Sequence, residues 1–83
     1  MSASGAKFRR ILLDFLREIR IEAGLRQVDL AKKLNVPQAR ISKYELGERR
    51  IDLLELRAIC EALEFPFLEF VEELEKRIKE KGN

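Results

Sequence analysis

Side chains able to carry out catalysis are scarce in this sequence. It contains no histidine and a single cysteine, Cys60, and it has neither a glycine-rich phosphate loop nor a cluster with the spacing of metal ligands. Cys60 lies among apolar residues at helical spacing. This predicts a small core residue and not a nucleophile or a redox switch, because a reactive thiolate needs exposure and nearby positive charge. We therefore predict that the protein is not an enzyme and binds no metal or cofactor.

Residues 27–46 favour a different chemistry, the recognition of a DNA surface. The segment reads QVDLAKKLNVPQARISKYEL, and its apolar spacing predicts two short amphipathic helices joined by a tight three-residue connection. The apolar residues that would pack between these helices are Leu30, Ala31, Leu34, Ile41 and Tyr44. This spacing is typical of a helix-turn-helix, whose second helix is shaped to enter the major groove.

The connection between the two helices has its own sequence signals. Asn35 tolerates the left-handed backbone conformation that ends a helix, and Val36 can then fill the space between the helices. Pro37 has a fixed φ and no N–H, so it suits the entry to a new helix and disfavours helix at the preceding residue. We expect helices over residues 27–34 and 38–46, the second ended by Gly47.

The residues around this motif extend the pattern. RIEAGLRQ precedes it at residues 20–27, and YELGERR closes it at residues 44–50. Together these segments closely resemble the five-helix DNA-binding domain of the phage lambda repressor and Cro family, also called xenobiotic-response-element type regulators. The resemblance runs from about residue 16 to about residue 70. It implies an all-α, compact five-helix fold and a sequence-specific DNA-binding transcriptional regulator, a repressor that occludes a promoter.

The resemblance also assigns residues to double-stranded DNA. Bases would be contacted by Gln38, Ala39, Ser42 and Lys43. Their chemistry fits this role, since an amide can pair with adenine, an ammonium can donate to guanine and a methyl group can touch thymine. Backbone phosphates would be contacted by Gln27, Arg40, Arg49 and Arg50. The alternative is an ordinary polar helix surface whose basic residues serve solubility.

Three further positions bear on the resemblance. Arg20 and Glu45 match a partly buried ion pair that pins the first helix against the end of the third in this family. Pro37 departs from the family, because a Ser or Thr usually caps the recognition helix and adds a hydroxyl contact to phosphate. Glu48 departs as well, since the residue after the glycine is usually basic or polar.

Regulators of this family usually bind palindromic operators as homodimers, with half-sites roughly 34 Å apart. The resemblance and the clustered phenylalanines place the dimer interface on the last helix, at Phe65, Phe67, Phe70, Leu74 and Ile78. The alternative is that the first half of this helix folds back as core, with Ile78 left to a partner or to fraying. Two other functions remain open: the antitoxin of a toxin–antitoxin pair, whose last helix grips a protein partner, and a protein-interaction module that has lost DNA binding.

Size and charge agree with a single DNA-binding domain. The chain has 83 residues and a net charge of +2, but residues 1–50 hold 12 Lys/Arg against 6 Asp/Glu, and residues 51–83 hold 5 against 9. Positive potential is therefore concentrated where the motif lies. No apolar run approaches membrane-spanning length and no secretory signal opens the chain, so we expect a cytoplasmic protein with no membrane partner.

Helical periodicity defines the remaining elements. We expect a disordered leader over residues 1–6 and one domain over residues 7–83, with helices over about 7–23, about 53–63 after an Asp52 cap, and from Pro66 onward into an extended C-terminal helix. The apolar residues at helical spacing are, in the first helix, Phe8, Ile11, Leu12, Phe15, Leu16 and Ile19, and in the last, Phe67, Phe70, Val71, Leu74 and Ile78. In the helix after Asp52, a buried stripe is predicted at Leu53, Leu56, Ile59, Cys60 and Leu63.

Overall fold

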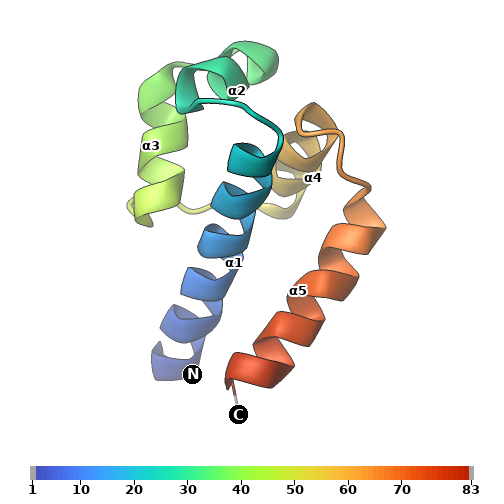
Figure 1. Ribbon diagram of the computed structural model, residues 1–83. Coiled ribbons are helices and arrows are strands. Elements are labelled where there is room, and N and C mark those ends of the chain that lie inside the picture. Colours follow the sequence, from blue (N-terminus) through green and yellow to red (C-terminus); the bar gives the residue numbers. More distant parts are fainter. Residues whose placement is uncertain (1, 83) are drawn as a thin grey trace.

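The computed structural model describes residues 2–82, and over that range the chain forms five helices and no strand (Figure 1). The helices are α1 (Ser2–Glu22), α2 (Gln27–Leu34), α3 (Gln38–Leu46), α4 (Leu53–Ala62) and α5 (Phe67–Gly82). The long helix α1 runs through the middle, with α5 along one side of it and the α2–α3 pair on the other (Figure 1). The predicted all-α, five-helix fold is confirmed.

The limits of α2 and α3 agree with those predicted from the sequence. Asn35 ends α2 with a φ of 57° and Gly47 ends α3 with a φ of 80°, both in the left-handed conformation. In each case the next N–H returns to a carbonyl five residues back, as from Val36 to Ala31 at 3.0 Å. This arrangement satisfies the last free carbonyls of the helix, so the turn ends one helix and aims the next.

Helices α1 and α4 end in the same way. Gly24 follows α1 with a φ of 76°, and Glu64 follows α4 with a φ of 57°. The N–H of Phe65 bonds to the carbonyl of Cys60 at 2.9 Å, which completes the motif at the end of α4. Glutamate was not expected here, because a residue with a Cβ adopts this conformation at a cost.

The first helix is longer than predicted. It begins at Ser2, whereas the sequence led us to expect a disordered leader over residues 1–6; Met1 lies outside the described residues. Residues 2–6 contain no proline and no β-branched side chain, so they can extend a helix already nucleated downstream.

A single core joins all five helices. Its buried members are Phe15, Leu16, Ile19, Leu30, Ala31, Ile41, Tyr44, Leu56, Ile59, Cys60, Leu63 and Phe70. Phe15 stacks on Phe70 with ring centroids 4.7 Å apart, and the edge of Phe65 packs against both rings. Aromatic pairs in these geometries add to the free energy gained by burying their surface. The aromatic group therefore holds α1 and the start of α5 together.

This packing corrects the predicted dimer interface. The Phe70 side chain is 0% exposed, so it has no surface to offer a partner, and Phe65 is partly buried against the same core. Phe70 cannot belong to a dimer interface, because Phe15 already covers its ring. The alternative, that the first half of the last helix is core, describes Phe70, whereas Phe65 precedes α5 and is only partly buried.

Other apolar side chains also differ from their predicted places. Leu53 was expected in the buried stripe of its helix but is exposed, as is its neighbour Leu54. On the last helix Val71, which follows the predicted apolar spacing, and Leu68, one turn before it, are exposed as well. Leu13, which was not predicted, is buried. The differences lie on α1, at the start of α4 and on α5, whereas the inner faces of α2 and α3 are buried as predicted.

The second half of α5 is attached to α1 by Arg77. Its guanidinium donates two hydrogen bonds to the Glu18 carboxylate, at 2.9 and 3.0 Å, and a third to Glu73 at 3.1 Å. It also lies over the ring of Phe15, 4.1 Å from the centroid, which is a favourable place for a cation. The long α1 thus gives α5 a partner beyond Leu74, whereas the sequence left this end, at Ile78, to a partner or to fraying.

Among the described residues, no helix is both long and apolar enough to cross a membrane.

Candidate nucleic-acid interface

Helix α3 presents one face to the core and the opposite face to solvent. Ile41 and Tyr44 are buried on the inner side. On the outer side Gln38, Ala39 and Lys43 are exposed and Ser42 is partly exposed. The four predicted base-contacting residues therefore share an outward surface that the rest of the domain leaves open.

The start of α3 departs from the family pattern at Pro37, as the sequence predicted. Pro37 is the N-cap, with φ −65° and ψ 148°, and its side chain makes no cap hydrogen bond. The first N–H groups of α3 thus have no side-chain acceptor at the cap. Gln38, the first residue of the helix, is held instead by a contact from another element.

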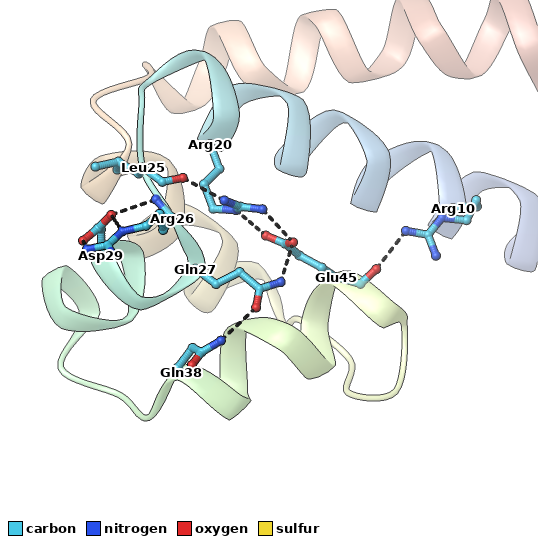
Figure 2. Close-up of polar contacts among 8 residues, drawn as sticks. All are labelled: Arg10, Arg20, Leu25, Arg26, Gln27, Asp29, Gln38 and Glu45. Atoms are coloured by element: carbon cyan, nitrogen blue, oxygen red, sulfur yellow. Dashed lines mark hydrogen bonds and ion pairs between the residues drawn. The ribbon is translucent and has the colours of Figure 1, made fainter.

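That contact is a hydrogen bond between two glutamines. Gln38 Nε2 donates to Gln27 Oε1 at 3.2 Å, across the turn between α2 and α3 (Figure 2). The bond fixes which end of each amide faces the other. Gln38 keeps its carbonyl oxygen as an acceptor and its second N–H as a donor. Adenine requires one of each.

Gln27 is held in turn by a buried ion pair. Its Nε2 donates to Glu45 Oε1 at 3.0 Å, and the same carboxylate accepts from Arg20 Nε at 2.6 Å and Arg20 Nη2 at 3.1 Å (Figure 2). Arg20 also donates to the carbonyl of Leu25 at 2.7 Å. Arg20 and Glu45 thus form the ion pair that the resemblance implied, joining α1 to the end of α3. The chain of bonds runs from the core to the outward amide of Gln38.

The end of α3 is held by two arginines that sequence reasoning missed. Arg10 Nη2 donates to the carbonyl of Glu45 at 2.9 Å, and Arg9 Nη2 donates to the carbonyl of Gly47 at 2.7 Å. These carbonyls lie at the negative end of the helix dipole, where a cation is favourable. No local signal could reveal the contacts, because more than thirty residues separate the partners in each case.

Comparisons with known proteins agree with this geometry. Residues 16–70 match a helix-turn-helix family. The chain belongs to this family, whose members of the XRE and lambda-repressor type regulate transcription. An XRE-family like protein from Pseudomonas syringae pv. tomato str. DC3000 is 33% identical, with a TM-score of 0.86 over 90% of this chain and 92% of that one.

Two solved structures of another regulator are also similar. The restriction-modification controller protein C.Esp1396I is 32% identical, with a TM-score of 0.79 over 86% of this chain and 91% of that one. Its tetramer in complex with its natural 35 base-pair operator is 32% identical, with a TM-score of 0.78 over 86% of this chain and 93% of that one. A comparison with curated sequences found no significant match.

This member of the helix-turn-helix family is therefore a DNA-binding transcription regulator, a class of proteins that bind DNA and catalyse no reaction. The predicted phosphate-contacting residues of such a regulator fall into two groups here. Gln27 stands at the start of α2, and Arg49 and Arg50 are exposed on the loop after α3. Arg40 differs, because it lines a groove of about 130 Å³ with Leu34, Val36 and Glu55 and so lies toward α4.

The start of α2 is fixed by a second arginine–carboxylate pair. Arg26 donates to Asp29 through its backbone N–H at 2.8 Å and through its guanidinium at 2.9 and 3.0 Å (Figure 2). The pKa of Asp29 is lowered to about 2, mainly by the hydrogen bonds from the Arg26 guanidinium and next by the one from the Arg26 backbone N–H. The free N–H groups of α2 therefore keep a defined direction beside Gln27.

One apolar residue joins the outward face of α3 unexpectedly. Leu46 is 63% exposed and lies on the same side of the helix as Ala39 and Ser42 by its spacing. It was predicted only as the last residue of the helix. Its spacing places it opposite Ile41 and Tyr44, which are buried on the inner face.

Proposed function

We propose that this regulator is a repressor that binds a palindromic operator as a homodimer, with α3 in the major groove. The observation that carries the proposal is the outward face of α3, on which Gln38 is aligned by Gln27. A regulator of the same family that is 32% identical has been solved as a tetramer on its operator, which supports operator binding by this fold. Binding over a promoter would block transcription by occlusion.

The proposed base contacts follow from the donors and acceptors on this face. Gln38 would pair with adenine through both ends of its amide, and Lys43 would donate to guanine. Ser42 can donate or accept, and the Ala39 methyl group can touch thymine. Each good bidentate contact discriminates against a wrong base by about 1–3 kcal/mol.

The proposed phosphate contacts come from two ends of the motif. Gln27 and the first N–H groups of α2 would hold one phosphate, where the helix dipole favours an anion. Arg49 and Arg50 would hold the backbone beyond the end of α3. Arg40 is not part of the proposed contact, because its side chain lies against α4.

The proposed dimer surface is the outer side of α5. Leu68 is 77% exposed and Val71 is exposed one turn later, while Phe67, Leu74 and Ile78 are partly exposed around them. An exposed apolar surface of this kind on a small domain suits a two-fold contact with the same surface of a second copy. Leu68 and Val71 replace Phe70 in the predicted interface, and Phe65, which is partly buried as Phe67 and Leu74 are, remains a candidate.

Selection of bound duplexes from a random pool tests the whole proposal. We expect an enriched palindrome whose half-sites lie about one helical turn apart. Gln38→Ala and Lys43→Ala should each relax the selected sequence at a different base pair, whereas Arg49→Ala should weaken binding to all sequences and reduce its salt dependence. Enrichment of no sequence, or unchanged selection by both α3 variants, would contradict the proposal.

A separate experiment tests the dimer. Leu68→Glu should make the protein monomeric in sedimentation equilibrium, because it places a charge in the proposed apolar contact. Glu72→Ala, on the same helix and exposed, is the matched control that should leave the dimer intact. A wild-type protein that is monomeric both alone and on the selected duplex would reject the homodimer.

Two exposed leucines at the start of α4 offer a second apolar surface that could bind a protein partner, as an antitoxin binds its toxin. Leu53 and Leu54 lie exposed at the start of α4, apart from the outward face of α3. Co-purification of a small protein with the wild type, lost in Leu54→Glu, would favour this second function.

We propose a cytoplasmic site of action, because a relative comes from the bacterium Pseudomonas syringae and bacterial DNA lies in the cytoplasm.

A further inference from the structure

A shallow trough lies between the first turns of α1 and the loop after α3. One part has a volume of about 130 Å³ and is lined by Arg9, Leu12, Leu13, Arg49, Arg50 and Ile51. A neighbouring part of about 200 Å³ is lined by Ala6, Arg9, Arg10, Leu13, Leu46 and Gly47. Arg9 borders both parts, and the buried Leu13 contributes to both. The trough therefore has apolar lining and several basic side chains.

Three of these arginines lack an anionic partner. Among the described residues, Arg9, Arg49 and Arg50 form no ion pair, whereas Arg10, Arg20, Arg26 and Arg77 each face a carboxylate. Neither Glu48 nor Asp52, the carboxylates nearest the loop in sequence, forms an ion pair with them. Glu48 does not line the trough, and Asp52 accepts from the backbone N–H of Glu55 at 2.7 Å as the cap of α4.

Two of the three guanidinium groups are also held in place. Arg9 donates from Nη2 to the Gly47 carbonyl at 2.7 Å, which leaves its other N–H groups available. Arg49 lies over the Tyr44 ring, with its guanidinium carbon 6.0 Å from the centroid. Like charges gathered with little freedom of movement repel one another, and an anion placed among them would remove that repulsion.

We infer that Arg9, Arg49 and Arg50 form a binding site for a backbone phosphate of duplex DNA, so that α1 takes part in DNA binding. The inference rests on the proposed function. Guanidinium groups suit phosphate because they offer parallel N–H donors that match its oxygens. The trough begins at Leu46 and Gly47, where the outward face of α3 ends, so a strand whose bases contact Lys43 would continue toward it.

The site does not depend on sequence, so its test uses a mixed-sequence duplex. Affinity is measured against salt concentration for the wild type, Arg9→Gln, Arg9→Lys and the control Lys76→Ala, an exposed cation on α5. We expect Arg9→Gln to bind several-fold more weakly, with a salt slope smaller by about 0.9, the value for one lost phosphate contact. Arg9→Lys and Lys76→Ala should keep the wild-type slope.

A purely structural role for Arg9 gives a different result. If its only function is the bond to the Gly47 carbonyl, Arg9→Gln and Arg9→Lys should both lower the thermal midpoint, while the salt slope stays at the wild-type value. That outcome overturns the inference and leaves the proposed function intact. Failure of the wild type to bind any duplex would instead reject the proposed function.

A measurement on the wild type covers the case in which Arg9→Gln does not fold. Nitrogen-15 spectra of the arginine Nε–H groups are recorded with the duplex and with inorganic phosphate at the same phosphate concentration. We expect the Arg9, Arg49 and Arg50 signals to shift with the duplex and to stay in place with inorganic phosphate. No shift of Arg9 with saturating duplex, or an equal shift with inorganic phosphate, would overturn a DNA-backbone site.

Discussion

Two arginines attach α1 to other helices, and their surroundings differ sharply. Arg20 joins α1 to α3 through Glu45, and the two side chains are 9% and 12% exposed. Arg77 joins α5 to α1 through Glu18, and those side chains are 24% and 46% exposed. Both guanidinium groups make two hydrogen bonds to one carboxylate. Both pairs are thus bidentate, but Arg20 donates from Nε and Nη2 and Arg77 from Nη1 and Nη2, and the Arg20 pair is the more deeply buried.

The two pairs also lead to different parts of the molecule. The Glu45 carboxylate accepts from Gln27, which in turn accepts from Gln38 on the outward face of α3. Arg77 instead lies over Phe15, inside the aromatic group that holds α5. Loss of the first pair should therefore disturb both folding and base recognition, whereas loss of the second should disturb the docking of α5.

The largest effect is expected from Glu45→Gln. The substitution leaves the guanidinium of Arg20 buried without a counter-charge, which typically costs about 3–5 kcal/mol of folding free energy. This is a large part of the total stability of a small domain. Urea unfolding of the variant and the wild type, followed by circular dichroism, measures the difference.

A double variant is the control for this prediction. Arg20→Met combined with Glu45→Gln removes the charge as well, and the introduced amide can still accept from Gln27. We expect the double variant to recover a substantial part of the lost stability. If it is less stable than Glu45→Gln alone, the stranded charge is not the cause.

A smaller effect is expected from Arg77→Met. The variant loses a cation–π contact and two partly exposed ion pairs, together worth about 1–2 kcal/mol, and keeps much of the apolar stem. Differential scanning calorimetry in low and high salt measures it, and the difference should shrink in high salt. Base preference on the selected duplex should not change, and a changed preference would contradict the separation of the two regions.

The pH dependence of the exposed pair is a finer test. The hydrogen bonds from Arg77 lower the pKa of Glu18 below its ordinary value of 4.5. A lowered pKa means that the folded state binds fewer protons than the unfolded state. The stabilisation is therefore complete above pH 4.5 and is lost as the pH falls through the folded pKa. The stability advantage of wild type over Glu18→Gln should follow this course in acid titrations; an advantage independent of pH would contradict it.

The smallest effect is expected from the pair at the start of α2. The pKa of Asp29 is lowered to about 2, mainly by the Arg26 guanidinium, so its contribution should persist well below the ordinary value of 3.8. Asp29→Asn should reduce the thermal midpoint slightly above pH 3.8, and the difference should vanish as the pH falls toward 2. An acid titration in which Asp29→Asn and wild type stay equally stable at every pH would show that the Arg26–Asp29 pair contributes nothing to stability.

The helix-turn-helix was predictable because its signals are local. Asn35, Pro37 and Gly47 each act through backbone preferences of one or two residues, and the limits of α2 and α3 follow from them. The outward placement of the base-contacting candidates was predictable as well, since it follows from the burial of Ile41 and Tyr44 on the opposite face.

The parts that were missed depend on contacts between distant residues. Phe70 is buried by Phe15, 55 positions earlier, and Arg77 is placed by Glu18, 59 positions earlier. A helical apolar stripe predicts which side of α5 is apolar, but it does not predict how far the helix rotates against α1. Phe70, predicted at the dimer interface, is therefore in the core, while Leu68 and Val71 are exposed.

The buried cysteine can report how often the folded domain opens. Cys60 is 1% exposed, and burial raises the pKa of its thiol to about 11, so a thiol reagent has no access to it and little thiolate to attack while the chain is folded. Alkylation at Cys60 must wait for α4 to separate from the core. The alkylation rate, followed by mass spectrometry without any label or mutation, therefore measures how often the domain opens, and a slower rate with duplex present would register binding as protection.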